Sequence, residues 1–155
     1  ELDPEYIDGA VKLLAKHKTC GVSTICSPME DQAELEDPHT VKCVVNVKGL
    51  AMYFSRASIP FPRLIDRLAR PEASILLKHQ GVYCFRRKEL LEFANLESPP
   101  IEAFEGLEQL RLLWYGYPIR VFMSGPAPKG IDTPKDYELF VKRVGRGRRR
   151  GRRKR

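Results

Sequence analysis

The sequence has no apolar run that approaches the roughly 18 residues of a membrane-spanning helix. Its start also lacks the basic, apolar and small-residue pattern of a signal peptide. We therefore expect a cytoplasmic protein with no membrane partner. With 155 residues, of which 43% are hydrophobic, the chain is long enough for one domain with a core of its own.

Metal-binding and disulfide patterns are missing as well. The four cysteines, Cys20, Cys26, Cys43 and Cys84, form neither a CxxC pair nor the dense spacing of a disulfide framework. The three histidines show no ligand spacing with them. Because three of the cysteines lie in apolar, strand-like segments, we interpret them as buried thiols.

Acidic residues are absent from residues 142–155, which hold ten of the 27 basic residues. Subtracting them leaves 17 basic and 20 acidic residues, a net charge of −3, in the rest of the chain. Residues 145–155 have no apolar side chain to bury, and we expect a disordered basic tail after a domain that spans residues 1–144. The tail can bind nucleic acid weakly through counterion release, although a solubilising extension explains the same composition.

The most informative stretch is EGLEQLRLLWYG, residues 105–116, which has the pattern of one complete helix. Leu107, Leu110 and Trp114 recur at three- and four-residue steps, and Phe104 and Leu113 widen this apolar face. The opposite face gathers Glu105, Glu108 and Gln109 around Leu112. Such a half-covered polar row can order the hydroxyl groups of a ligand. A solvated helix face, with Arg111 as an ion-pair partner, explains the pattern equally well.

The other segments alternate between helix and strand patterns. The spacing predicts a helix from residue 4 to about residue 18, with an apolar face of Ile7, Ala10, Val11 and Leu14. Residues 41–47 and 50–55 read as a hairpin with a turn at Lys48 and Gly49. Further strands are predicted at 22–26, 81–85 and 118–123, and further helices at 87–96, with Leu90 and Leu91 facing inward, and at 135–144. This order predicts an α/β fold.

Four motifs, in this order, resemble those of the 3-deoxy-manno-octulosonate cytidylyltransferase (CMP-Kdo synthetase) family. They are GLAMYFSRASIP at 49–60, KHQGVYCFR at 78–86, the stretch 105–116 and GIDTPKD at 130–136. The resemblance covers residues 3–144 and implies a mixed sheet with helices on both faces, as in nucleotide-diphospho-sugar transferases. It also implies CMP transfer from CTP to the sugar acid Kdo for lipopolysaccharide biosynthesis, with release of pyrophosphate. Residues 61–71 match an arm that helps to form a homodimer.

The resemblance also implies roles for individual residues. Arg56 would pair with the sugar carboxylate, Asp132 would hold Mg²⁺, and the hydroxyl groups of the sugar would be bound by His79, Tyr83, Glu108 and Gln109. From the residues alone, Arg56 is as readily a surface arginine at a strand end, His79 a structural histidine and Asp132 a helix-entry residue. Cys84 and Phe85 depart from the small residue and tyrosine that are common in the family.

The sequence also lacks a glycine-rich phosphate loop, and this absence has the largest consequence for the expected activity. Family members carry such a loop, and a second metal-binding aspartate, before the region matched here. The 155 residues contain no such loop, and they begin with a helix entry that follows a Gly-Asp-Glu-Pro turn in the family. We therefore expect a carboxyl-terminal portion that is incomplete at its N-terminus and inactive alone. The alternative is a sugar-acid-binding or RNA-associated fragment without chemistry.

Overall fold

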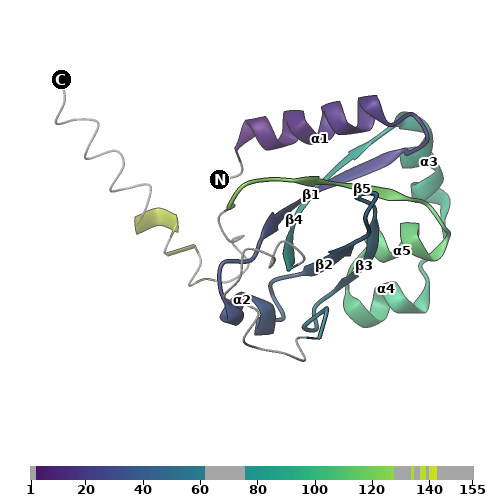
Figure 1. The fold of residues 1–155 in the computed structure, drawn as a ribbon. Coiled ribbons are helices and arrows are strands. Elements are labelled where there is room, and N and C mark those ends of the chain that lie inside the picture. The colour runs from purple at the N-terminus through teal and green to yellow at the C-terminus, as the bar shows by residue number, and fades with distance from the viewer. Residues whose placement is uncertain (1–2, 62–75, 128–133, 135–136, 139, 143–155) are drawn as a thin grey trace, which may run out of the picture.

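The computed structural model describes residues 3–61, 76–127, 134, 137–138 and 140–142. Its centre is a five-stranded mixed sheet with the strand order β3-β2-β4-β1-β5 (Figure 1). The strand β1 runs parallel to β5 and antiparallel to β4, and β2 is antiparallel to both of its neighbours. The expected hairpin and the other three expected strands are therefore confirmed.

The elements follow one another along the chain as α1 Pro4–Lys16, β1 Val22–Pro28, α2 Gln32–Glu36, β2 Lys42–Val45, β3 Ala51–Ser55, β4 Leu77–Phe85, α3 Arg87–Asn95, α4 Pro100–Glu105, α5 Gln109–Trp114 and β5 Ile119–Met123.

Helices cover both faces of the sheet, as expected for the fold class. On one face lies α1, where Ser23 of β1 donates a hydrogen bond to the carbonyl of Ala10 at 2.9 Å. Because side chains alternate along a strand, Val22 and Cys26 point to the opposite face. There they join the buried Leu110 and Leu112 of α5 in the main core cluster. The predicted site residues of β4 lie on this second face, which α5 covers.

The cysteines behave as the sequence indicates. Cys20, Cys26 and Cys43 are buried, Cys84 is half-buried, and all four are free thiols. Burial is the main cause that raises the pKa of Cys26, and its close contact with Cys43 adds to the effect. These thiols therefore serve as small apolar core residues.

The helix predicted for residues 105–116 is wrong. The first helix, α4, ends at Glu105, and Gly106 follows in a left-handed conformation with φ of 62°. The chain then starts the separate helix α5 at Gln109. This break leaves Leu107 and Leu110 in the core but exposes Phe104 and Trp114, whose exposed fractions are 94% and 58%.

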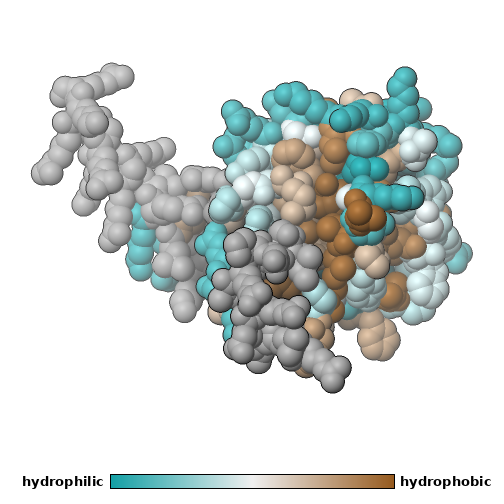
Figure 2. All heavy atoms as spheres, in the orientation of Figure 1, coloured by the Kyte–Doolittle hydropathy of each residue, from teal (hydrophilic) through white to brown (hydrophobic). Residues whose placement is uncertain are grey.

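Two other helices also bury less than their patterns predict. In α1, Ala10 and Leu14 are buried, whereas Ile7 and Val11 are largely exposed. In α3, the predicted inward residues Leu90 and Leu91 are about half exposed, at 48% and 49%. Figure 2 shows one face of the molecule, where apolar side chains gather in a strip over the sheet and the margins are hydrophilic. The exposed fractions show that part of the apolar face of α1 and of α3 is uncovered in this chain.

Replacing Gly106 with alanine is expected to lower the free energy of unfolding by about 1 kcal/mol. The added Cβ has room, since its nearest neighbour would be Arg56 Nε at 3.9 Å, so the cost comes from the positive φ alone. Urea denaturation of the two proteins measures the difference. Gly81→Ala is the comparison, because Gly81 also has a positive φ, of 66°, and an added Cβ there meets nothing within 4 Å, so it should cost about the same. An unchanged stability for Gly106→Ala would contradict the left-handed cap.

In the described part of the chain, no helix is long and apolar enough to cross a membrane. The expected dimer arm at 61–71 and the basic tail at 145–155 fall, apart from Phe61, outside the described residues, and both stay predictions.

Candidate functional site

His79 lies near the start of β4 with its imidazole enclosed on the face covered by α5. Its ring meets Phe54 edge-on, with the centroids 5.0 Å apart, and lies 5.2 Å from the ring of Tyr83. Part of the residue reaches the surface, but burial of the ring lowers its pKa from 6.5 to about 4. The imidazole is therefore neutral at pH 7.

The hydroxyl of Thr24 fixes the tautomer of this imidazole. Thr24 Oγ1 lies 2.7 Å from His79 Nε2 and donates its one proton to the carbonyl of Val82, also at 2.7 Å. A carbonyl can only accept, so the hydroxyl proton is committed and Nε2 must be the donor to Oγ1. Nδ1 is then the unprotonated nitrogen, which is an acceptor for a ligand hydroxyl.

Tyr83 carries a buried polar atom that the described part of the chain leaves without a hydrogen bond. No described side chain meets its hydroxyl with hydrogen-bonding geometry. Burial is the main cause that raises the pKa of Tyr83, and the nearby carboxylate of Glu108 raises it further, both by its charge and as the acceptor toward which the hydroxyl lies, although the pair falls short of hydrogen-bonding geometry. A buried hydroxyl without a partner is costly, and a ligand oxygen at this point would satisfy it.

Gln109 and Glu108 stand side by side at the start of α5 but differ in exposure. Gln109 is 2% exposed, and its Nε2 has no hydrogen-bond partner among the described residues. Glu108 is exposed. The pair thus offers buried amide donors beside an accessible carboxylate, the combination that a polyhydroxylated ligand requires.

Arg56 follows the end of β3, and its guanidinium is held by backbone carbonyls. Nε donates to Glu105 O at 2.8 Å, Nη1 to Pro38 O at 3.0 Å and Nη2 to Gly106 O at 3.5 Å. None of the ion pairs found among the described residues involves Arg56. Because a guanidinium has five N–H groups, one on each terminal nitrogen remains for a carboxylate.

Contacts and short separations along the chain connect the five predicted substrate-binding residues. His79 touches Tyr83, Tyr83 lies beside Glu108, and Arg56 is bonded to Gly106. Gly106 and Glu108 are two residues apart, which is at most roughly 7 Å between their Cα atoms. The structure thus brings these five residues to one region, around the link between α4 and α5.

Asp132, the predicted magnesium ligand, lies outside the described residues. Within the described ranges, no group of three or more His, Cys, Asp or Glu side chains could hold a metal ion. The magnesium site therefore stays a prediction.

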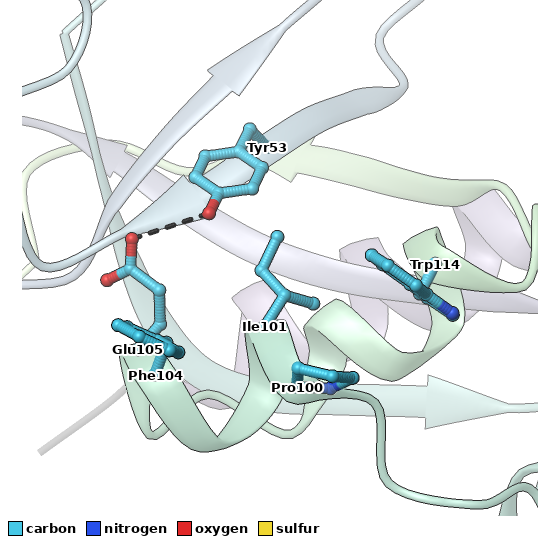
Figure 3. A pocket seen from close by; sticks show the side chains of 6 residues that line it. All are labelled: Tyr53, Pro100, Ile101, Phe104, Glu105 and Trp114. Carbon is cyan, nitrogen blue, oxygen red and sulfur yellow. Dashed lines mark hydrogen bonds between the residues drawn. The ribbon is translucent and has the colours of Figure 1, made fainter.

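A groove of about 560 Å³ lies next to this region, lined by Tyr53, Pro100, Ile101, Phe104, Glu105 and Trp114 (Figure 3). It contains none of the five predicted residues and meets them only through Glu105, which bonds to Arg56. Its lining is mostly apolar, so it is distinct from the polar cluster around His79.

Two residues that support the cluster were not predicted from the sequence, and a third has a role other than the two considered for it. Thr24 sets the tautomer of His79, but a threonine in an apolar strand gives no signal of such a role. Lys42 is fully buried, and a lysine inside the apolar run of β2 was a signal that could have been used. For Glu105 the sequence left open a ligand-facing row or a solvated helix face, whereas both of its carboxylate oxygens are bonded to the end of β3.

Replacing Tyr83 with phenylalanine is expected to leave the free energy of unfolding unchanged or to raise it by up to about 1 kcal/mol, because the lost hydroxyl has no described partner. The same change should weaken binding of a polyhydroxylated ligand by roughly fivefold to tenfold. Denaturation and calorimetry measure the two effects. Tyr115→Phe, on an exposed side chain, should change neither. A clear loss of stability in Tyr83→Phe would show that the hydroxyl has a partner, for which the Glu108 carboxylate is the candidate.

With this geometry in place, the mixed sheet covered by helices on both faces defines a nucleotidyltransferase-like α/β fold. The family model described as "Cytidylyltransferase" matches residues 2–123. The chain therefore belongs to the cytidylyltransferase family.

Individual relatives agree with the family. The chain is 42% identical over 141 residues to the 3-deoxy-manno-octulosonate cytidylyltransferase of Polynucleobacter necessarius, covering 88% of this chain and 53% of the relative. The enzyme of the same name from Syntrophotalea carbinolica is 41% identical over 138 residues, covering 87% and 55%. Among solved structures, a CMP:2-keto-3-deoxy-manno-octonic acid synthetase complexed with CTP matches with a TM-score of 0.82 and 33% identity, covering 94% of this chain and 58% of the other. The chain thus spans about half the length of the curated relatives it matches.

Proposed function

We propose that this chain supplies the sugar-acid-binding part of a CMP-Kdo synthetase, which transfers CMP from CTP to Kdo and releases pyrophosphate. The names of the curated relatives support Kdo as the acceptor, and the solved relative in complex with CTP supports CTP as the donor. Absence of a glycine-rich phosphate loop from the 155 residues supports the restriction to the sugar-acid part.

The observation that carries the proposal is the way Arg56 is held. Three backbone carbonyls orient its guanidinium, and no described carboxylate pairs with it. An oriented, unpaired guanidinium is a site for a carboxylate, since two parallel N–H groups match its two oxygens. Kdo carries such a carboxylate, and in this proposal it occupies the free side of Arg56.

The remaining residues would bind the hydroxyl groups of the sugar. His79 Nδ1 and the Glu108 carboxylate accept, the Gln109 amide donates, and the Tyr83 hydroxyl can do either. In the reaction, the anomeric oxygen of Kdo forms a bond to the α-phosphorus of CTP while the bond from this phosphorus to the leaving pyrophosphate breaks. Such a transfer depends mainly on positioning and on neutralising charge. We assign to these five residues the orientation of Kdo for that attack.

Other parts of the proposal rest on the family resemblance alone. They include Asp132 as a ligand of Mg²⁺, which would neutralise phosphate charge when bound, since this ion prefers oxygen ligands. They also include a homodimer, a cytoplasmic location and a role in lipopolysaccharide biosynthesis.

Calorimetry with Kdo tests the binding proposal, and a pyrophosphate assay with CTP, Kdo and Mg²⁺ tests the restriction to the sugar-acid part. The 155-residue chain should release heat with Kdo, and none with mannose, which lacks the carboxylate. It should release no pyrophosphate. Absence of binding would contradict the assignment of the site, whereas turnover by the purified chain would contradict the restriction to the sugar-acid part.

A further inference from the structure

The backbone of Arg56 is held on both sides by ionisable side chains from other elements. On one side is Glu105, the last residue of α4. Its Oε2 accepts a hydrogen bond from the backbone N–H of Arg56 at 2.9 Å. Its Oε1 accepts from the hydroxyl of Ser55 at 2.6 Å and, more weakly, from that of Tyr53 at 3.4 Å. Figure 3 shows the contact with Tyr53 at the edge of the groove. Both carboxylate oxygens are therefore committed to the end of β3.

On the other side is Lys42, which is fully buried in β2. Its Nζ donates to the backbone carbonyl of Arg56 at 2.8 Å and to that of Asp37 at 2.6 Å. Burial is the main cause that lowers the pKa of Lys42, and the charge of Asp37 partly offsets the shift. A buried ammonium is costly, and its fixed position ties the loop before β2 to the end of β3.

We propose that Glu105 and Lys42 are positioning residues, which clamp the backbone of Arg56 so that its guanidinium faces the ligand at a fixed distance from Glu108 and Gln109. This inference rests on the proposed function, in which Arg56 binds the sugar carboxylate. The clamp is direct, because one side chain holds the N–H and the other the carbonyl of the same residue. A binding group must be held within roughly 0.5 Å of its productive position, which a strand end without such support does not ensure.

The test is Glu105→Gln, which keeps the size of the side chain. The amide has one oxygen acceptor where the carboxylate has two, so it cannot accept from Ser55 Oγ and from the Arg56 N–H in the present geometry. Hydrogen exchange should become faster at the Arg56 amide, and affinity for Kdo should fall about tenfold. Glu102→Gln is the matched control, because Glu102 lies in the same helix but pairs with Arg111. It should leave Arg56 exchange and Kdo affinity unchanged.

A double-mutant cycle separates positioning from general stability. If Glu105 acts through Arg56, Glu105→Gln should weaken Kdo binding much less in the Arg56→Lys background than in the wild type. Equal losses in both backgrounds, or unchanged exchange at Arg56 in Glu105→Gln, would overturn the inference.

Should Glu105→Gln not fold, Glu105→Asp replaces it, because the shorter acid keeps the charge but does not reach the Arg56 N–H. If the wild-type chain does not bind Kdo, the proposed function fails, and the exchange rate at Arg56 still decides whether the clamp exists.

Discussion

Replacing Arg56 with lysine is expected to weaken Kdo binding by about 10- to 100-fold, because a lysine cannot reproduce the bidentate pairing with a carboxylate. The three carbonyl bonds that orient the guanidinium would also be lost, and the remaining ammonium would be free to move. Calorimetry of the two proteins gives the ratio of the dissociation constants.

Arg120→Lys is the matched control for this change. Arg120 is also an arginine bonded to a backbone carbonyl, that of Lys48 at 2.9 Å, but it lies in β5 and makes no described contact with the predicted cluster. Its replacement should leave Kdo affinity unchanged. If Arg56→Lys binds Kdo as tightly as the wild type, Arg56 does not hold the sugar carboxylate.

Acidification is expected to destabilise the fold through His79. The pKa of its imidazole falls from 6.5 to about 4 in the folded chain, so the folded state favours the neutral form. Above pH 6.5 the imidazole is neutral in both the folded and the unfolded chain, so its titration does not reduce the free energy of unfolding. As the pH falls from 6.5 to 4, the unfolded chain binds a proton that the folded chain does not, and the free energy of unfolding decreases. The total loss is about 3 kcal/mol, since each pH unit in that window corresponds to roughly 1.4 kcal/mol.

The measurement is the free energy of unfolding at several pH values for the wild type and for His79→Gln. Carboxylates also titrate near pH 4, but they contribute equally to both proteins. The difference between the two profiles therefore isolates His79, and it should shrink as the pH falls from 6.5 to 4. Parallel profiles would mean that the imidazole is not enclosed as described.

The strands and the fold class were predictable because they depend on local patterns. Alternation of apolar residues in 41–47 and 50–55, with a glycine turn, predicts a hairpin wherever the chain places it. The free, buried cysteines follow from the absence of any metal or disulfide spacing. These features need no knowledge of distant contacts.

The interruption of the helix at Gly106 was not predictable from periodicity. Leu107 and Leu110 keep a helical spacing across the break, so the apolar pattern continues where the backbone does not. The left-handed turn at Gly106 is stabilised by tertiary contacts, because the carbonyls of Glu105 and Gly106 accept from Arg56, about 50 residues away. For the same reason the sequence could not show that Glu105 supports the site instead of facing the ligand.

The central claim is that Arg56, His79 and Tyr83 line one binding site for an acidic sugar. An NMR titration of the 155-residue chain with Kdo tests it most directly, with the Arg56 Nε–H, the His79 ring and the Trp114 indole N–H as probes. The account predicts that the Arg56 and His79 signals shift along one common saturation curve, while the exposed indole of Trp114, in the neighbouring groove, stays in place. Saturating shifts at Trp114 without shifts at Arg56 and His79, or no shifts at all, would contradict it.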